Sequence, residues 1–421
     1  MPGGVSMTAL RFLHMLRSLL RVVALLLLLG SASPTAAAQV TSLSDSARIS
    51  MITILPGDRI YTEFGHSALR VQDPAHDFDA LYSYGTFDFD DPLFVPKFTY
   101  GRLTYFLSVA HYPGMLRHYR RYGRPVIEQH LNLTPNQQQA LFRFLQTNAR
   151  PENRYYQYDF LFDNCSTRIR DALETTLNDD VQFAPRPDLN RSFRELLDPY
   201  VADRPLLDLG FDLALGTPSD AIATPYQSMF LPEHLLTAFN HATVTTAGTT
   251  QPLVTRTDTV LWVEGYDATE SAFPWTIAVT WLLLLGTLAW TGWQAMQNHP
   301  PGTAADATVL SLTGTAGLVL CFLWFISEHT VTDWNWNLAW AWPTHLGAAV
   351  LLVRSQTHRH LTHYLGITAV LMLALGLGWA WWPQNLHPAL QPLVLALAVR
   401  AGWQAHVRSN TASGREIHPT P

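Results

Sequence analysis

YDFLFDNCSTRIRD, residues 158–171, contains Cys165, one of the chain's two cysteines, directly after two residues that often cap helices. Asp163 and Asn164 are residue types that begin helices, so the sequence predicts that Cys165 lies in the first turn of a helix. The helix dipole and free backbone N–H groups there favour a thiolate and can stabilise the oxyanion formed when a carbonyl is attacked. We therefore expect Cys165 to act as a nucleophile that Asn164 and Ser166 help to position. The plainer alternative is a small residue packed at a helix start.

FGHSALRV, residues 64–71, alternates like a strand and contains the preferred base, His66. A cysteine nucleophile needs an imidazole that is near in space, not in sequence. DALYSYGTF, residues 79–87, has the pattern of a returning strand and offers Ser83 and Tyr84 to orient that imidazole across the hairpin. A structural role for His66 and simple cross-strand packing of Ser83 and Tyr84 are the alternatives.

The surrounding pattern predicts an α+β domain. Strands joined by Pro, Gly and Asp turns occupy residues 49–86, and VTRTDTVLWVEG, residues 254–265, closes the domain as a further strand. Thr134 and Pro135 begin a predicted helix, and another runs from Cys165 onward. The aromatic and basic stretch Phe94–Tyr119 has no regular period, so we expect it to be irregular.

The N-terminal residues have the pattern of an export signal. Arg11, Arg17 and Arg21 precede a short apolar core, and small residues with a plausible cleavage site follow it. We expect residues 1–38 to be a signal peptide; an uncleaved anchor is the alternative. Both interpretations place residues 39–268, the predicted catalytic domain, in the periplasm.

Residues 269–421 predict a membrane bundle of about five helices with a cytoplasmic tail. The apolar runs are 275–296, 308–327, 336–353, 365–382 and 389–399. By length the first two can span a bilayer, the third and fourth are adequate and the fifth is short. Arg residues follow the third and fifth runs, whereas the linkers 328–335 and 383–388 contain no Lys or Arg. The positive-inside rule therefore agrees with the export signal and predicts an inner-membrane protein.

Cysteine use and charge exclude several classes of protein. The second cysteine, Cys321, lies in an apolar run, so the exported domain cannot form an internal disulfide. A net charge of −6 without a basic stripe gives no reason to expect nucleic acid. Metal-binding, phosphate-loop and serine-hydrolase motifs are missing, so we expect neither a metal nor a cofactor.

Some charged residues are candidates for binding a lipid. Lys97, Arg102 and Arg168 are suited to a lipid phosphate, although a solvated surface is the simpler role for each. Glu328 and His329 lie at an expected external helix end, beside a Trp-rich loop that either belongs to the membrane interface or meets the catalytic domain.

Five motifs, taken in order, resemble one known family. They are FGHSALRV (64–71), LYSYGTFDFDDPLF (81–94), KFTYGRLTYFL (97–107), YDFLFDNCSTRIRD (158–171) and MFLPEHLL (229–236). Together they resemble the Lnb-type lipoprotein N-acyltransferases, and the order of His and Cys resembles circularly permuted papain-like proteins such as lecithin:retinol acyltransferase. The resemblance covers about residues 44–245. It implies Cys165 and His66 as the catalytic pair, and where the family pattern has Asn this chain has Ser83.

Three functions follow as hypotheses. The first is an acyltransferase that moves a fatty acyl chain from a phospholipid, through a thioester on Cys165, to the N-terminal amine of a diacylated lipoprotein. The second is a membrane-bound cysteine hydrolase of the same fold, either a phospholipase or a cell-wall peptidase or amidase. A wall enzyme would need no five-helix anchor. The third is a non-enzymatic assembly or sensor protein in which Cys165 is structural.

Overall fold

The computed structural model describes residues 41–184, 190–246, 248–266, 272–354 and 359–412. The predicted signal peptide, residues 1–38, lies outside the described residues. All contacts reported below lie within residues 43–421, which form one unit.

A seven-stranded antiparallel sheet forms the centre of the first domain. In spatial order its strands are β10 (Val254–Leu261), β5 (Val126–Leu131), β1 (Arg48–Ile54), β2 (His66–Asp73), β3 (Phe78–Thr86), β4 (Thr104–His111) and β6 (Tyr155–Gln157). The strands predicted within residues 49–86 form the middle of this sheet, and the predicted closing strand is its edge. The domain is α+β, as the sequence indicated.

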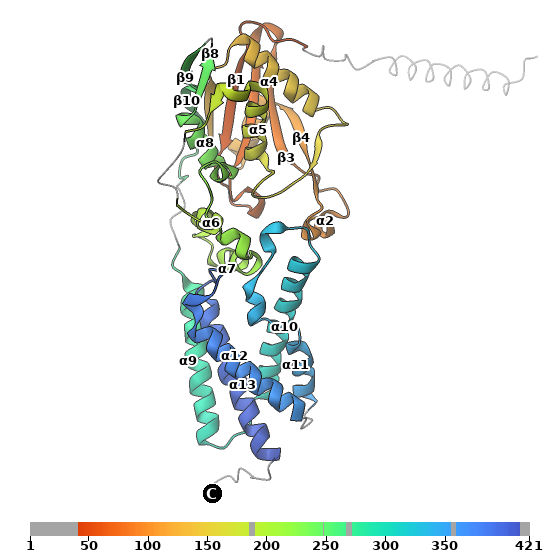
Figure 1. The fold of residues 1–421 in the computed structure, drawn as a ribbon, viewed down its shortest axis with the longest axis vertical. Helices are drawn as coiled ribbons and strands as arrows, with labels where there is room; N and C mark the ends of the chain where they lie inside the picture. The colour runs from red at the N-terminus through yellow and green to blue at the C-terminus, as the bar shows by residue number, and fades with distance from the viewer. Residues whose placement is uncertain (1–40, 185–189, 247, 267–271, 355–358, 413–421) are drawn as a thin grey trace, which may run out of the picture. The chain divides into compact units, whose positions relative to one another are not determined.

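Two helices, α4 (Pro135–Asn148) and α5 (Cys165–Leu177), lie against one face of the sheet (Figure 1). Thr134 caps α4 and forms a capping box with Gln137, which satisfies two backbone donors at the helix start. Ile169 and Leu173 of α5 are completely buried, and α5 packs on β2 and β3. The predicted starts of both helices are therefore correct.

The expectation that Phe94–Tyr119 is irregular is wrong. This stretch forms α2 (Phe94–Tyr100), β4 and α3 (Tyr112–Arg121). Helix α2 ends at Gly101, whose φ of 81° suits a residue without a side chain. In β4 polar and apolar residues occur on both faces, so the alternation that identifies a strand is hidden, although Tyr105 and Leu107 are the buried ones.

The remaining elements of this domain are short. They are α6 (Phe193–Val201), α7 (Pro205–Ala214), α8 (Pro232–His241) and a small sheet of β7 (Val181–Gln182), β8 (Thr243–Thr246) and β9 (Thr249–Pro252). A 3-10 helix, η1 (Ile60–Thr62), precedes β2.

Five α-helices occur in the described part of residues 272–412. They are α9 (Trp275–Met296), α10 (Thr303–Phe325), α11 (His345–Val353), α12 (Arg359–Leu377) and α13 (Leu390–Ala412). Among the described residues, α9, α10 and α12 are long and apolar enough to cross a membrane. The third predicted segment is interrupted, because η7 (Trp336–Ala339) precedes Pro343 and leaves α11 with nine residues. Conversely, the fifth segment is longer than predicted, since α13 has 23 residues.

A buried ion pair joins α10 to α13. Arg400 donates to both carboxylate oxygens of Asp306, at 2.7 and 2.8 Å. Gln294 of α9 accepts from Arg400, and Gln404 donates to Asp306. Because charged side chains are costly inside a membrane domain, full pairing explains how Arg400 is accommodated there.

Close backbone contact between α10 and the segment before α11 supports a first prediction. A Cβ at Gly317 would lie 2.0 Å from the carbonyl oxygen of Ala341, whereas a Cβ at Gly286 in α9 meets nothing within 4 Å. We expect Gly317→Ala to destabilise the detergent-solubilised protein by about 2 kcal/mol or more, and Gly286→Ala to have little effect. Thermal unfolding measures both; equal melting temperatures for the two variants would contradict the packing described.

Candidate active site

The Asn164 side chain fixes the start of α5. Its Oδ1 accepts hydrogen bonds from the backbone N–H groups of Ser166 and Thr167, at 2.8 and 3.0 Å. Its Nδ2 donates to the carbonyl oxygens of Phe160 and Phe230, at 2.8 and 2.9 Å. The side chain is buried and uses both its donors and its acceptor, so it holds Cys165 at the first position of the helix.

The sheet opens where this helix begins. Strands β2 and β3 pair from Asp73, opposite Phe78, to Leu69, opposite Tyr82. His66 lies beyond the last of these pairs and is paired with Ile54 of β1. On the other side of β3 the register with β4 shifts between Ser83 and Thr86. Gly85, at the centre of this irregularity, has a φ of 82°, a conformation that glycine adopts without strain.

Cys165 and His66 border the same small space at this opening. A Cβ built on Gly85 would lie 3.4 Å from Cβ of Cys165, 3.9 Å from its backbone nitrogen and 4.0 Å from Cε1 of His66. Both side chains are partly exposed. The fold thus brings together the predicted nucleophile and base, which are far apart in the sequence, and Gly85 leaves room between them.

Ser83 is the residue that contacts the imidazole. Its Oγ lies 2.7 Å from Nε2 of His66, so Nδ1 is the ring nitrogen left to exchange a proton with a thiol. Tyr84 is buried and its ring packs against Tyr156 instead, with the centroids 6.3 Å apart. Of the two predicted orienting residues, only Ser83 is bonded to His66 in the described residues.

Ser166 supports the cysteine from the side of the helix. Its Oγ lies 4.0 Å from Sγ of Cys165 and 3.1 Å from Oγ of Ser67, the residue after His66. The backbone N–H groups of Ser166 and Thr167 are already bonded to Asn164. The N–H of Cys165 itself, which faces the space at Gly85, is therefore the better placed donor for an oxyanion.

Burial controls the charge of this pair. It raises the pKa of the Cys165 thiol above its ordinary value, although backbone N–H groups of Ser67 and of the helix start act in the opposite direction. Burial, assisted by the charge of Arg124, lowers the pKa of His66 to about 3. At neutral pH the site therefore rests as thiol and neutral imidazole. The expected preference of the helix start for a thiolate does not offset burial.

The three cations predicted to receive a phosphate each have a carboxylate partner. Lys97 Nζ lies 2.6 Å from Asp91, and Arg102 Nε lies 2.6 Å from Glu328. Arg168 bonds Asp163 through two nitrogens and stacks over the ring of Tyr156 at 4.0 Å. Their role in binding substrate stays a prediction.

Glu328 and His329 connect the membrane domain to α2. The backbone N–H of Glu328 donates to the carbonyl oxygen of Tyr100 at 2.8 Å, and its carboxylate accepts from Arg102. Nε2 of His329 lies 2.8 Å from the carbonyl oxygen of Phe98. This loop therefore meets the exported domain, as one of the two sequence interpretations proposed.

Two asparagines of the same loop cap the end of α7. Nδ2 of Asn335 donates to the carbonyl oxygen of Leu213 at 2.8 Å, and Nδ2 of Asn337 donates to that of Asp212 at 3.1 Å. Both asparagines are almost completely buried. They satisfy carbonyl groups that a helix end leaves without partners, so they join the two domains firmly.

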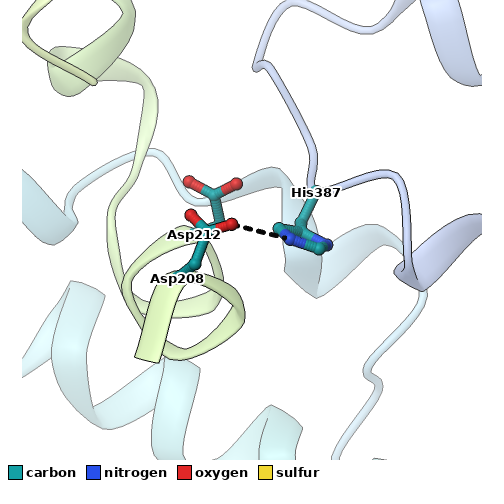
Figure 2. A group of neighbouring side chains, drawn as sticks. All are labelled: Asp208, Asp212 and His387. Carbon is teal, nitrogen blue, oxygen red and sulfur yellow. Dashed lines mark hydrogen bonds and ion pairs between the residues drawn. The ribbon is translucent and has the colours of Figure 1, made fainter. Parts of the chain in front are cut away.

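Asp208, Asp212 and His387 form an acidic group at this junction (Figure 2). Nδ1 of His387 accepts from the N–H of Ala389 at 3.0 Å, so Nε2 carries the proton that it shares with Asp208 at 3.3 Å. Asp212 is bonded to Arg194 at 2.6 Å. Since the imidazole lone pair and one carboxylate are already engaged, these residues do not fit a metal ion, and we assign them to the junction.

Arg124 and Tyr156 are site residues that the sequence did not indicate. Arg124 is 7 % exposed, donates through Nε to the carbonyl oxygen of Leu55 at 2.9 Å and has no carboxylate partner among the described residues. The Tyr156 hydroxyl is buried with no hydrogen-bonding partner in the described residues. An ionised Cys165 would interact electrostatically with both side chains. An arginine in a polar loop and a tyrosine in an aromatic run carry no local signal of such a position.

Two family models match the chain. The Lnb N-terminal periplasmic domain matches residues 35–198, and the Lnb transmembrane domain matches residues 268–411. The chain belongs to the Lnb family. Lnb proteins are membrane enzymes that modify lipoproteins, so a periplasmic domain and a transmembrane domain are shown for this member. Searches of curated proteins and of solved structures find no match to it.

The bond between Ser83 and His66 gives a second prediction. Ser83→Ala removes the group that orients the imidazole, so acylation of Cys165 by an activated ester should slow roughly five- to tenfold. Ser83→Asn, which introduces the residue of the family pattern, should restore most of the rate. Ser108→Ala is the matched control, because Ser108 bonds Thr86 on the same strands and not His66. An unchanged rate in Ser83→Ala would remove Ser83 from the site.

The neutral resting pair gives a third prediction. Since burial raises the pKa of Cys165, the rate of its alkylation by iodoacetamide should keep rising above pH 9 in a Cys321→Ser background. A thiolate–imidazolium pair would instead react at a nearly constant rate between pH 5 and 8. Mass spectrometry of the alkylated protein against pH measures the profile, and such a plateau would contradict the neutral pair.

Proposed function

We propose that this Lnb protein is a lipoprotein N-acyltransferase with a cysteine nucleophile. The observation that carries the proposal is the shared space at Gly85, bordered by Cys165 at a helix start and by His66. Family membership supports the lipoprotein as acceptor. The loop that contains His329 and Asn335 supports a lipid donor, because it connects the catalytic domain to the membrane domain through α2 and α7.

The first half-reaction forms a thioester. Nδ1 of His66 takes the proton of the thiol as Sγ of Cys165 attacks an ester carbonyl of a phospholipid. The N–H of Cys165 donates to the oxyanion of the tetrahedral intermediate. When this intermediate collapses, the C–O bond to glycerol breaks and His66 returns the proton to the departing alkoxide. A lysophospholipid leaves, and the acyl chain stays on sulfur.

The second half-reaction transfers the acyl chain. The N-terminal amine of a diacylated lipoprotein attacks the thioester carbonyl while His66 accepts a proton from that amine. The C–S bond then breaks, the sulfur is protonated by His66 and the amide is released. No oxidant, metal or cofactor is needed for the atoms and charges to balance.

The finer features of the fold form part of this proposal. A cysteine at the start of a helix that packs on an antiparallel sheet, with the histidine on an earlier strand, supports a circularly permuted papain-like topology. We also infer five membrane segments, with α11 and α13 completing the bundle in the inner membrane. The catalytic domain then comprises residues 39–268, and residues 269–421 form the anchor.

A phospholipase is the second candidate, because Cys165 and His66 are partly exposed and water can reach a thioester there. Adding a diacylated lipopeptide to the purified enzyme with labelled phospholipid separates the two functions. The acyltransferase yields an acylated peptide, and the phospholipase yields free fatty acid at an unchanged rate.

A fourth prediction tests the proposed function in cells. The parent enzyme and three variants, Cys165→Ala, Cys165→Ser and Cys321→Ser, are expressed in cells that lack their own lipoprotein N-acyltransferase. Mass spectrometry of a lipoprotein should find triacylation with the parent and with Cys321→Ser, the control for loss of a cysteine, and none with either Cys165 variant. Triacylation by Cys165→Ala would contradict the mechanism, and its absence with the expressed parent would contradict the acceptor.

A further inference from the structure

A group of large apolar side chains remains exposed next to the site. It consists of Ile60 and Tyr61 of η1 together with Phe89, Leu93, Val95 and Phe98, which lie just before or within α2. Val95 is 67 % exposed and Leu93 is 55 % exposed. We call these six residues the apolar lip. Contiguous exposed apolar side chains are rare on soluble surfaces and mark sites of contact with lipid or protein.

The lip is continuous with the site through stacked aromatic rings. Phe89 contacts Phe87 with the ring centroids 4.6 Å apart, and Phe87 contacts Tyr105 at 5.3 Å. Tyr105 in turn stacks on Tyr158 at 4.2 Å. Phe87 also follows Gly85 by two residues. A series of aromatic contacts therefore connects the exposed lip to the end of β3 at Gly85, which Cys165 and His66 border.

The lip is also continuous with the membrane domain. The ring of Phe98 lies 6.1 Å from that of His329, and Tyr100 at the end of α2 contacts Phe322 of α10 at 6.2 Å. Helix α10 is one of the helices apolar and long enough to cross a bilayer. These contacts attach the helix that bears the lip to the end of a membrane segment, which is where lipid chains begin.

We propose that the apolar lip inserts into the outer leaflet of the membrane that holds α10, and that it binds an acyl chain of a phospholipid and leads it to Cys165. The guidance to Cys165 rests on the proposed function, whereas the contact with the bilayer does not. Burying exposed side chains of this size in hydrocarbon removes apolar surface from water and so stabilises the membrane-bound state.

The charges of the segment suit a zwitterionic surface. Asp91 is neutralised by Lys97 at 2.6 Å, whereas Asp88 and Asp90, on either side of Phe89, are exposed. Carboxylates at headgroup depth are attracted by ammonium groups and repelled by anionic lipids. Vesicles or nanodiscs of phosphatidylcholine are therefore the appropriate probe.

A fifth prediction tests the contact with the bilayer. Leu93→Cys and Val95→Cys are labelled with an environment-sensitive fluorophore in full-length protein that carries Cys165→Ser and Cys321→Ser, reconstituted in phosphatidylcholine nanodiscs. Lipid with a doxyl quencher on the acyl chain should quench both labels. The matched control is Val109→Cys, an exposed apolar position on β4. Equal quenching at all three positions, or none at Leu93 and Val95, would overturn the proposal; energy transfer between labelled copies would assign the surface to a second copy.

The guidance step has its own measurement. The double variant Leu93→Glu, Val95→Glu is acylated on Cys165 either by membrane phospholipid or by a short soluble ester. The ratio of the first rate to the second should fall at least about tenfold relative to the parent. Val109→Glu is the control and should keep the parent ratio. An unchanged ratio in the lip variant overturns the guidance alone, whereas a parent enzyme that no phospholipid acylates overturns the proposed function while leaving the quenching result intact.

Discussion

The side chain of Asn164 is the interaction on which the candidate site depends. It is the only described side chain that both caps α5 and bonds the carbonyl groups of two other segments, at Phe160 and Phe230. A buried amide that leaves any of these groups without a partner would cost about 1–3 kcal/mol, so the four bonds favour one position for the helix start. Because Cys165 is the next residue, its sulfur is held at the opening of the sheet.

The electrostatics of the site follow from this placement. The thiol and the imidazole are both largely enclosed by protein, which disfavours an ion pair at rest. Arg124 is a buried cation with no carboxylate partner in the described part of the chain, and its charge favours an anion on Cys165 while it disfavours an imidazolium. A site of this kind stays unreactive until a substrate carbonyl accepts the negative charge.

The sequence predicted the parts of the site that depend on local chemistry. Asn164 as a cap, Cys165 as the first helical residue and a contact between Ser83 and His66 all follow from residue types and strand alternation, and the structure has each of them. Strands and helices with a clear hydrophobic periodicity were also predicted correctly, because periodicity is a local property of the sequence. Sequence alone did not indicate β5 or β4, because polar residues fall on both faces of each strand and hide the alternation that identifies a strand.

What the sequence could not predict depends on tertiary packing. The pKa directions of Cys165 and His66 are set by burial among distant segments, and the position of Arg124 follows from the pairing of β1 with β5. The short length of α11 also reflects packing, since the residues before it cross α10 at Gly317 instead of continuing as helix. Hydropathy averaged over a window registers an apolar segment there, and only Pro343 marks the break in the sequence.

The central claim is that the sulfur of Cys165 and the imidazole of His66 meet across Gly85. It is tested most directly with 1,3-dibromoacetone, whose two reactive carbons flank one carbonyl and can bridge only neighbouring nucleophiles. The purified protein in its Cys321→Ser form is treated, digested and analysed by mass spectrometry. We expect a peptide in which Cys165 is linked to His66. Cys165 modified at one end alone, or linked to another residue while His66 stays unmodified, would contradict the account.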